Sequence, residues 1–319
     1  MNPLILALDF GGTKLTAGVT SPGNHNWYAH KRTFSPPHAD ASTDIKIMIS
    51  LAQELLAEDK PTAIGVSFGG PVDFTTGIVR LSHHVPGWEN MPLQKLLEEK
   101  FNVPVTVDND ANVAALGEHF LGAGQGYNSL MYITVSTGIG GGWILNGKPW
   151  RGANGMAGEI GHTVIDPNGP LWFGKHGCVE RFASGPFIAQ RAREWLQTKP
   201  NQGQILRNLV GDDLEQITAQ LVSQAAEKGD ELAIQALEKA GWALGVGISN
   251  TANLVNPELF ILGGGVTKSG EAFWQTLCQA ARETAMPEVE FEIIPAALGD
   301  DAPLWGAVAL AENLVEKSL

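Results

Sequence analysis

The sequence is short of cysteine and of long apolar runs, and both shortages exclude whole classes of protein. Cys178 and Cys278 are the only cysteines among 319 residues, so the chain is not built on a disulfide framework and suits a reducing compartment. No apolar run approaches the roughly 20 residues of a membrane-spanning helix. The N-terminus also lacks the basic segment and apolar stretch of a secretory signal. We therefore expect a cytoplasmic protein with no membrane partner.

Positive charge is scarce as well. Lysine and arginine number 21 against 34 aspartates and glutamates, a net charge of -13, and no basic run occurs. This balance argues against a nucleic-acid partner. A polyanionic ligand would have to be held by backbone amides, helix N-termini and a divalent cation. The length and the hydrophobic content of 44% allow one large core or two moderate ones, and two domains are the better expectation.

Stretches with strand character alternate along the chain with stretches of helical periodicity. Strands are expected at residues 4–10, 15–20, 62–68, 103–107, 130–136, 142–145, 258–262 and 289–294. Helices are expected at residues 44–58, 92–101, 111–121, 186–197, 213–226, 230–254, 271–285 and 303–315. The alternation predicts an α/β chain with mostly parallel, helix-covered sheets.

One carboxylate stands at a junction that open α/β folds use for ligands. Asp110 follows the predicted strand 103–107 and precedes the predicted helix 111–121, and ligands bind such folds at the carboxyl ends of strands. Taken alone, Asp110 is more simply explained as an N-terminal helix cap. Glycine-rich turns elsewhere in the chain change that preference.

Two of these turns form a weak internal repeat. Residues 6–18 and 131–143 each read as a strand, a Gly/Thr-rich turn and a second strand. Such turns let backbone amides approach phosphates closely. A third glycine run, 261–266, suits a backbone lying against a nucleoside, or it is a plain turn that needs positive φ. Together with Asp110, the turns predict phosphoryl transfer from a nucleotide to a hydroxyl, with Asp110 as the base.

Several motifs occur in the order of one known family. They are Asp9-Phe-Gly-Gly-Thr-Lys14, Gly65-x-x-x-x-Gly-Pro-Val-Asp73, Pro86-Gly-Trp88, Asn109-Asp-Ala-Asn112, Ser136-Thr-Gly-x-Gly-Gly141, Gly158-Glu-Ile-Gly-His162, Gly177-Cys-Val-Glu-Arg-Phe-Ala-Ser-Gly185 and Gly263-Gly-Gly265. With these motifs the chain resembles the ROK sugar kinases, the bacterial glucokinase-like branch of the actin/hexokinase/Hsp70 superfamily. The resemblance covers nearly the whole length.

The resemblance implies a two-domain actin/hexokinase-like (ribonuclease H-like) α/β fold with the active site in the interdomain cleft. We expect an N-terminal domain at 1–115 and a larger C-terminal domain at 116–302, with a hinge near 111–123. The last helix, within 303–319, is rich in small residues and should pack closely, back onto the first domain. The family habit also implies a homodimer.

The resemblance also assigns roles to matching positions. Asp110 is the base for the sugar 6-hydroxyl. The residues that hold or border the sugar are Gly70, Asn109, Glu159, His162 and Glu180. The residues that hold ATP phosphates and hydrated Mg²⁺, the metal through Asp9, are Asp9, Gly11, Gly12, Thr13, Lys14, Thr137 and Gly138, and the nucleoside borders Gly264 and Gly265.

For some of these positions a plainer explanation stays open. Glu159 and His162 could be surface residues, although Gly158 and Gly161 beside them predict a tight turn. Glu180 could simply complement the dipole of a helix that starts there. Trp88 is expected to pack in the core.

The chain departs from the family pattern at two places. His84 stands where the family often has a sugar-contacting Asn, so it bears on sugar choice. Most members also bind a structural zinc through three cysteines and the His of the Gly-His motif, but Leu171 and Phe173 occupy two of the cysteine positions here. His162 and Cys178 alone do not make such a site, so we expect no zinc. We expect residues 171–173 to replace the metal by apolar packing and to orient the loop that carries Glu180.

The predicted activity is an ATP- and Mg²⁺-dependent hexose kinase that gives the sugar 6-phosphate, with glucose as the first candidate. An N-acetylmannosamine or N-acetylglucosamine kinase is the alternative within the class. A non-catalytic sugar-sensing member is the alternative outside it, but such regulators carry an N-terminal DNA-binding segment, whereas Met1 here closely precedes the first strand. A filament-forming actin-like protein would need neither Asp110 nor the pair of Glu159 and His162.

Overall fold

The computed structural model describes residues 3–82, 84–211 and 213–316, which form two compact units. Unit 1 comprises residues 3–132, 142–157 and 296–316, and unit 2 comprises residues 133–141 and 158–295. The chain therefore passes between the units four times, after residues 132, 141, 157 and 295. The predicted boundary after residue 115 falls inside helix α3 (Asp110–Leu121) of unit 1, and so does most of the segment expected as a hinge.

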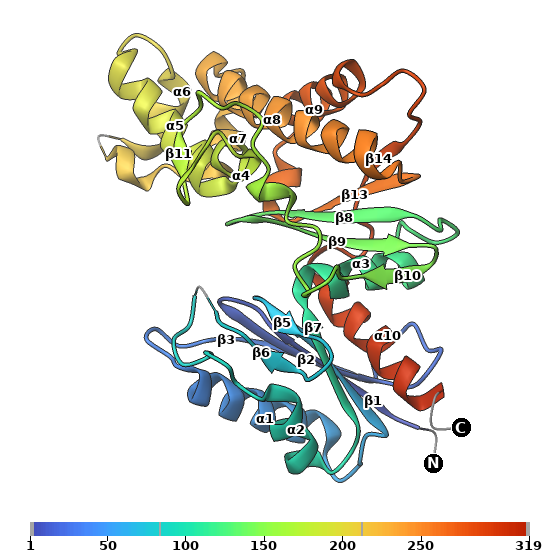
Figure 1. Ribbon diagram of the computed structural model, residues 1–319. Coiled ribbons are helices and arrows are strands. Elements are labelled where there is room, and N and C mark those ends of the chain that lie inside the picture. The colour runs from blue at the N-terminus through green and yellow to red at the C-terminus, as the bar shows by residue number, and fades with distance from the viewer. Residues whose placement is uncertain (1–2, 83, 212, 317–319) are drawn as a thin grey trace. The chain divides into compact units, whose positions relative to one another are not determined.

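Unit 1 is built on a five-stranded sheet (Figure 1). Its strands, in the order β3-β2-β1-β4-β7, are Ala29–Phe34, Lys14–Thr20, Ile5–Phe10, Ala63–Phe68 and Val105–Asn109. β1 runs antiparallel to β2 and parallel to β4, β2 runs antiparallel to β3, and β7 is parallel to β4. The expectation of mostly parallel strands was therefore wrong for this sheet, because the tight glycine turn between β1 and β2 can join only antiparallel strands.

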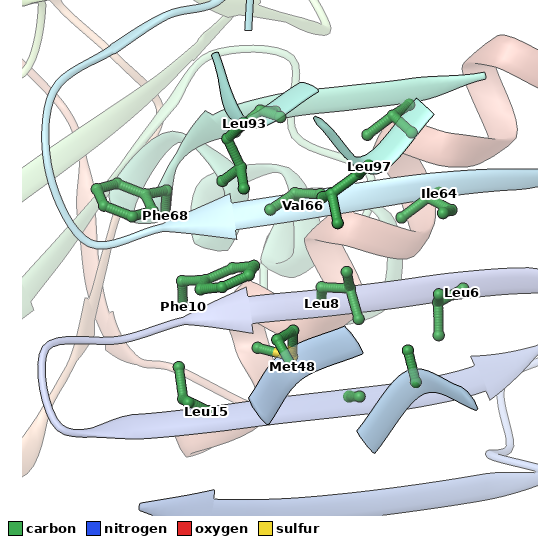
Figure 2. Packing of buried hydrophobic residues seen from close by; sticks show 14 of the residues in the cluster. Leu6, Leu8, Phe10, Leu15, Met48, Ile64, Val66, Phe68, Leu93 and Leu97 are labelled. Carbon is green, nitrogen blue, oxygen red and sulfur yellow. The ribbon is translucent and has the colours of Figure 1, made fainter. Parts of the chain in front are cut away.

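Two helices, α1 (Ala41–Leu56) and α2 (Leu93–Phe101), bury their apolar faces on this sheet. Figure 2 shows Met48 of α1 and Leu97 of α2 over the strands, against Leu8 and Val66. Trp88 is 1% exposed, with its ring centroid 4.6 Å from that of Phe68. It packs in the core as expected, directly beneath the ends of β1 and β4.

Helices α3 and α10 (Ala302–Glu316) pack against each other, and α10 also packs on β1 and β4. The approach is close because glycines face backbone. A methyl group on Gly65 of β4 would overlap the carbonyl oxygen of Ala307, and one on Gly306 would overlap that of Val113. The small residues of the last helix thus bring it against a strand of the first sheet, the packing expected from its composition.

Unit 2 contains most of the remaining helices. They are α4 (Val179–Ala183), α5 (Gly185–Thr198), α6 (Gln204–Val210), α7 (Ala219–Glu227), α8 (Glu231–Val255) and α9 (Glu271–Thr284). α8 packs along α9 and contributes a fully buried row that includes Leu237, Leu244 and Ile248. Strand β13 (Leu259–Gly263) pairs in parallel with β14 (Glu292–Pro295).

A second five-stranded sheet has the order β10-β9-β8-β13-β14. Its other strands are β8 (Leu130–Val135), β9 (Ile139–Leu145) and β10 (Lys148–Trp150). Two-residue strands form the small pairs β5–β6 (Val72–Asp73 and Ile78–Val79) and β11–β12 (Leu171–Trp172 and Lys175–His176). Among the helices in the described ranges, none combines the length and the apolar character needed to span a bilayer.

Candidate active site

The start of α3 holds two of the predicted site residues. Asn109 is the N-cap, because its Oδ1 accepts from the backbone N–H groups of Ala111 at 3.0 Å and Asn112 at 3.4 Å. Its Nδ2 donates to the carbonyl oxygen of Gly70 at 3.1 Å and to Oδ1 of Asp110 at 3.0 Å. The plainer explanation of Asp110 as the helix cap is therefore wrong, since Asn109 makes the capping bonds that its side chain favours.

The carboxyl group of Asp110 faces the ends of the neighbouring strands of unit 1. Its Oδ1 also accepts from the backbone N–H of Ala111 at 2.8 Å. Its Oδ2 lies 3.7 Å from the position that a Cβ on Gly69 would take, and the N–H of Gly69 donates to the carbonyl oxygen of Phe10 at 2.9 Å. Asp110 thus lies beside the strand end that leads into the Asp9–Lys14 turn.

Asp9 at the end of β1 is held in an unusual electrostatic state. The pKa of this carboxyl is raised to about 7, mainly by burial and also by the negative charges of Asp110 and Asp301. A hydrogen bond from Oγ of Ser67 at 2.7 Å and the charge of Arg32 act in the opposite direction. A carboxyl with a neutral pKa beside a second carboxylate is a place where a cation would be favoured.

A buried ion pair lies directly behind the Asn109–Asp110 pair. Asp108 Oδ2 accepts from Nε of Arg151 at 2.6 Å, and its Oδ1 accepts from the backbone N–H of Asn109 at 2.8 Å. Burial raises the pKa of Asp108, while Arg151 opposes the rise. The guanidinium of Arg151 also stacks on Phe74, 3.6 Å from the ring centroid. Arg151 could not be predicted from the sequence, since a single arginine 43 residues from its partner leaves no local signal.

The first glycine turn is compact and open to solvent. The N–H of Gly11 donates to the carbonyl oxygen of Lys14 at 2.9 Å, and Thr13 is exposed. Nζ of Lys14 lies 3.3 Å from Oδ2 of Asp300 in a solvent-exposed pair. Exposed pairs of this kind are weak, so the ammonium group remains available to an anionic ligand.

His84 lies against this same turn. A Cβ on Gly12 would sit 2.7 Å from Cδ2 of the His84 imidazole, so the ring covers the face of Gly12. The backbone N–H of His84 donates to Oγ of Ser82 at 3.2 Å. His84, expected from the sequence to bear on sugar choice, is therefore also a neighbour of the Asp9–Lys14 turn, which is expected to hold phosphates and is called the phosphate-type turn below.

The second glycine turn borders a cavity of about 860 Å³ within unit 2. The N–H of Ser136 donates to the carbonyl oxygen of Gly138 at 2.9 Å, which closes the turn. Thr137 lines the cavity, together with Arg193 of α5 and Gln224 of α7. The volume falls in the range of small-molecule and cofactor sites.

The third glycine run forms another wall of this cavity. Gly264 has φ +91° and lies so close to β8 that a methyl group would overlap the carbonyl oxygen of Val135. Gly265 begins a short 3₁₀ turn (Gly265–Lys268) and lines the cavity. Gly264 is therefore required by close backbone approach, whereas a Cβ on Gly265 would meet no atom within 4 Å, which leaves room for a ligand beside it.

Glu159 directly precedes a 3₁₀ turn (Ile160–His162), and His162 is its last residue. Oε2 of Glu159 lies 3.9 Å from Nε2 of His162, and the two side chains are 45% and 34% exposed. Gly158 has φ +93°, and Gly161 lies against the carbonyl oxygen of Ile139. The tight turn expected from the two glycines is confirmed, and it presents both polar side chains on one surface of unit 2.

Glu180 is largely buried, unlike Glu159 and His162. Its residue is 9% exposed, its Oε1 accepts from Nε1 of Trp172 at 2.7 Å, and its Oε2 accepts from the N–H of Ile139 at 2.8 Å. These two side-chain bonds give Glu180 a role that a simple complement to the dipole of α4 would not require. Within the described ranges, no three His, Cys, Asp or Glu side chains are placed to hold a metal ion.

The expected apolar replacement for the zinc loop was wrong in its detail. Leu171 and Phe173 are 58% and 63% exposed, so they do not form a buried cluster. Only Trp172 turns inward, with its ring centroid 4.6 Å from that of Phe187. Leu171 and Trp172 form the two-residue strand β11 and point to opposite faces, and Phe173, with φ +45°, lies in the turn that follows.

The structure therefore gathers the predicted residues in two groups, each within one unit. Unit 1 holds Asp9, Gly11, Gly12, Thr13, Lys14, Gly70, His84, Asn109 and Asp110. Unit 2 holds Thr137, Gly138, Glu159, His162, Glu180, Gly264 and Gly265.

Comparison with known proteins gives one consistent family. A family model described as the ROK family matches residues 5–314. A curated glucokinase from Halalkalibacterium halodurans is 40% identical over 271 residues, covering 82% of this chain and 80% of the relative. The crystal structure of a ROK family glucokinase from Streptomyces griseus in complex with glucose and AMPPNP is 31% identical, with a TM-score of 0.83 over 97% of this chain and 99% of that one. A ROK family transcriptional regulator, a homologue of the E. coli MLC protein, is 25% identical, with a TM-score of 0.87 over 99% of this chain and 81% of its own.

The raised pKa of Asp9 generates a prediction about stability. An unfolded Asp titrates near 3.8 and Asp9 of the folded protein near 7, so between these pH values the native state keeps a proton that the unfolded state has lost. The free energy of unfolding should therefore fall as the pH rises from about 4 to about 7, with no further fall from this group above that range. Asp9→Asn should remove this part of the pH dependence and raise the free energy of unfolding at pH 8 by about 1–3 kcal/mol.

Denaturant titrations of the unliganded protein at pH 5 and pH 8 measure both effects. Asp59→Asn, at an exposed position, is the matched control and should behave as the wild type. An Asp9→Asn variant that loses as much stability as the wild type between the two pH values would contradict the assignment.

Proposed function

The chain belongs to the ROK family, and we propose that it is an ATP-dependent hexose kinase that phosphorylates the 6-hydroxyl of glucose or a related hexose. The observation that carries the proposal is the arrangement in unit 1: the Asp110 carboxylate lies at the start of α3, beside the strand ends that lead into a phosphate-type turn. Relatives described as glucokinases at up to 40% identity support the same activity.

Asp110 acts as the general base of this reaction. The proton of the sugar 6-hydroxyl passes to the Asp110 carboxylate while the hydroxyl oxygen attacks the γ-phosphorus of ATP. The bond from that phosphorus to the bridging oxygen breaks, and ADP leaves with the electron pair. Such a transfer needs positioning and charge neutralisation more than covalent help. The bonds from Asn109 and Ala111 to Asp110 Oδ1 fix the orientation of the base.

Each of the other sugar hydroxyls can both donate and accept a hydrogen bond, so carboxylate, amide, imidazole and backbone groups can all recognise them. In unit 1 these are the side-chain amide of Asn109 and the backbone beside Gly70, which are already hydrogen-bonded to each other. In unit 2 they are Glu159, His162 and Glu180. Glu159 and His162 project from one 3₁₀ turn, so the two groups would bind neighbouring hydroxyls.

The nucleotide is held by glycine-rich backbone. The cavity bordered by Thr137 and Gly265 has the size of a nucleoside site, and backbone amides of the two glycine turns would hold the phosphates, with Lys14 adding a positive charge. The carboxylate at Asp9 fits a hydrated Mg²⁺, since this ion takes oxygen ligands and usually keeps several waters. When bound, the ion would neutralise charge on the phosphates. We place the enzyme in the cytoplasm as a homodimer.

Two rival activities predict different results with sugars and ATP. An N-acetylmannosamine or N-acetylglucosamine kinase would use the same base with a different sugar. The likeness to a transcriptional regulator of the family supports the second rival, a sugar-sensing regulator. Such a protein would bind sugar without turnover. Asp110 argues for catalysis, because sugar binding alone does not need a base beside a phosphate-type turn.

One coupled assay separates these possibilities. ADP release is followed with ATP and Mg²⁺ against glucose, mannose, fructose, N-acetylglucosamine and N-acetylmannosamine. We expect the highest kcat/KM with glucose. Preference for an N-acetylated sugar would move the enzyme to the alternative substrate class, and sugar binding by calorimetry without turnover would identify a regulator.

Replacing the base should separate turnover from binding. Asp110→Asn keeps the size of the side chain but cannot accept the proton, so kcat should fall by about 10²- to 10⁴-fold. The dissociation constant for glucose, measured by calorimetry, should change by less than about threefold, because the loss lies in the reacting step. Asp59→Asn again serves as the control, and wild-type turnover in Asp110→Asn at neutral pH would refute the role of Asp110.

His84 should tune the choice of sugar more than the reaction rate. His84→Asn restores the amide common in the family, so the ratios of KM among the five sugars should change while kcat for glucose stays within about threefold. His25→Asn, at an exposed position, is the control. Unchanged sugar ratios with an altered KM for ATP would instead assign His84 to the phosphate turn that it contacts.

The protein should carry no structural zinc. His162 and Cys178 remain from the family's ligand set, and a structural zinc site needs four ligands. Elemental analysis of protein purified without chelator should give well under one zinc per chain, and activity lost on EDTA treatment should return with magnesium alone. A value near one zinc per chain, or recovery that needs zinc, would overturn this expectation.

A further inference from the structure

Both carboxylate oxygens of Glu180 are fixed by N–H donors from different parts of unit 2. One donor is the indole Nε1 of Trp172 at 2.7 Å, and the other is the backbone N–H of Ile139 at 2.8 Å. Hydrogen bonds to a carboxylate are among the stronger ones in proteins. Each oxygen keeps a second lone pair, so a carboxylate held in this way can still accept from a ligand hydroxyl.

Trp172 is itself held in place by aromatic packing. Its ring lies edge-on to Phe187 at 4.6 Å and to Phe173 at 4.7 Å, and Phe173 in turn lies 5.6 Å from the His162 ring. The β11–β12 hairpin thus touches both His162 and Glu180. Its inward contact depends on Trp172, since Leu171 and Phe173 are mostly exposed.

The second donor connects Glu180 to the turn that borders the nucleotide-sized cavity. Ile139 follows Thr137 and Gly138 directly, and a Cβ on Gly138 would lie 2.9 Å from Oε2 of Glu180. The N–H of Gly185, two residues past α4, also donates to the carbonyl oxygen of Ser136 at 2.8 Å. α4, through Glu180, and the first residue of α5 are therefore both hydrogen-bonded to this turn.

We propose that Trp172 is a positioning residue for sugar binding, which acts by holding the Glu180 carboxylate through its indole N–H. The inference rests on the proposed function, in which Glu180 accepts from a sugar hydroxyl. In this chain an indole hydrogen bond would orient the Glu180 carboxylate, a function for which the zinc-bound loop is available in most family members. Without the indole donor, Oε1 would lose a fixed partner and the carboxylate would rotate away from the orientation that the sugar needs.

The direct test is Trp172→Phe, which keeps an aromatic ring against Phe187 and removes only the donor. Loss of a hydrogen bond to a charged group should raise the KM for glucose about tenfold or more. kcat and the KM for ATP should stay within about threefold, because Asp110 and the Ile139 bond are untouched. Trp172→His, which retains a ring N–H, should recover part of the affinity for glucose.

A double-mutant cycle separates positioning from general loosening. If Trp172 acts through Glu180, Trp172→Phe in a Glu180→Gln background should change the glucose KM by less than about twofold. Trp274→Phe is the matched control, because Nε1 of Trp274 donates to the carbonyl oxygen of Thr267 at 2.7 Å, away from Glu180. At saturating ATP it should leave the glucose KM within twofold.

The outcomes distinguish this inference from the proposed function. Absence of hexose turnover in the wild type would refute the function; glucose dissociation constants then replace KM in the same cycle, and a wild type that binds no sugar refutes the inference as well. Normal wild-type kinetics with an unchanged glucose KM in Trp172→Phe, or an equal rise in both backgrounds, would overturn the inference alone.

A spectroscopic measurement on folded protein covers the case in which Trp172→Phe does not fold. In protein with ¹⁵N-labelled tryptophan, Glu180→Gln should move one indole N–H resonance strongly, and saturating glucose should move the same resonance in the wild type. If glucose leaves that resonance unchanged, or if Glu180→Gln moves none, the indole does not report on the sugar and the inference fails.

Discussion

The arrangement of unit 1 depends on which of two neighbouring side chains caps α3. Asn109 satisfies the first N–H groups of the helix and also donates to Gly70 and Asp110. This single amide therefore relieves Asp110 of the capping role, orients its carboxylate and ties the helix start to the strand end at Gly70. The Asp108–Arg151 pair behind it fixes the backbone from which both side chains project. An Asp at the capping position would be committed to backbone N–H groups and less available as a base.

Unit 2 also holds a carboxylate, that of Glu180, in a fixed orientation, but it does so with different hydrogen-bond donors. Glu180 is held by one indole and one backbone N–H, and through Ile139 it is joined to the glycine turn at the cavity. Glu159 and His162, by contrast, project from an open turn and are partly exposed. The enclosed carboxylate is thus the fixed element of this group, and the exposed pair can adjust to a ligand.

Much of the fold could be predicted because it depends on local patterns. Buried strands such as β1 and β4 carry apolar runs, and the expected ranges 4–10 and 62–68 differ from the structure only at the first residue. β9 begins at Ile139, before the expected range 142–145, because its glycines looked like part of the turn. β3 was missed because its side chains are mostly polar and partly or fully exposed, which leaves no alternation to detect. The sequence led to the expectation that residues 171–173 orient the loop that carries Glu180, but the hydrogen bonds of Arg151 to Asp108 and of the Trp172 indole to Glu180 are contacts that only the folded chain creates. For residues 171–173 the composition suggested a buried cluster, whereas Leu171 and Phe173 are mostly exposed and Trp172 alone of the three turns inward.

The negative net charge of the protein explains why we expect backbone amides and a bound cation, more than basic side chains, to hold an anionic ligand. With a net charge of -13, a polyphosphate meets a repulsive field over most of the surface, so binding must rely on backbone amides and on a cation at the site. The protonation of Asp9 near neutral pH fits this requirement, because a protonated carboxyl does not repel phosphate and a deprotonated one can accept Mg²⁺. The burial that produces this state also destabilises the unliganded protein at alkaline pH, since the buried anion has no full partner there. Asp9 thus lowers the stability of the unliganded protein, and a bound Mg²⁺ would supply the positive charge that the Asp9 carboxylate lacks.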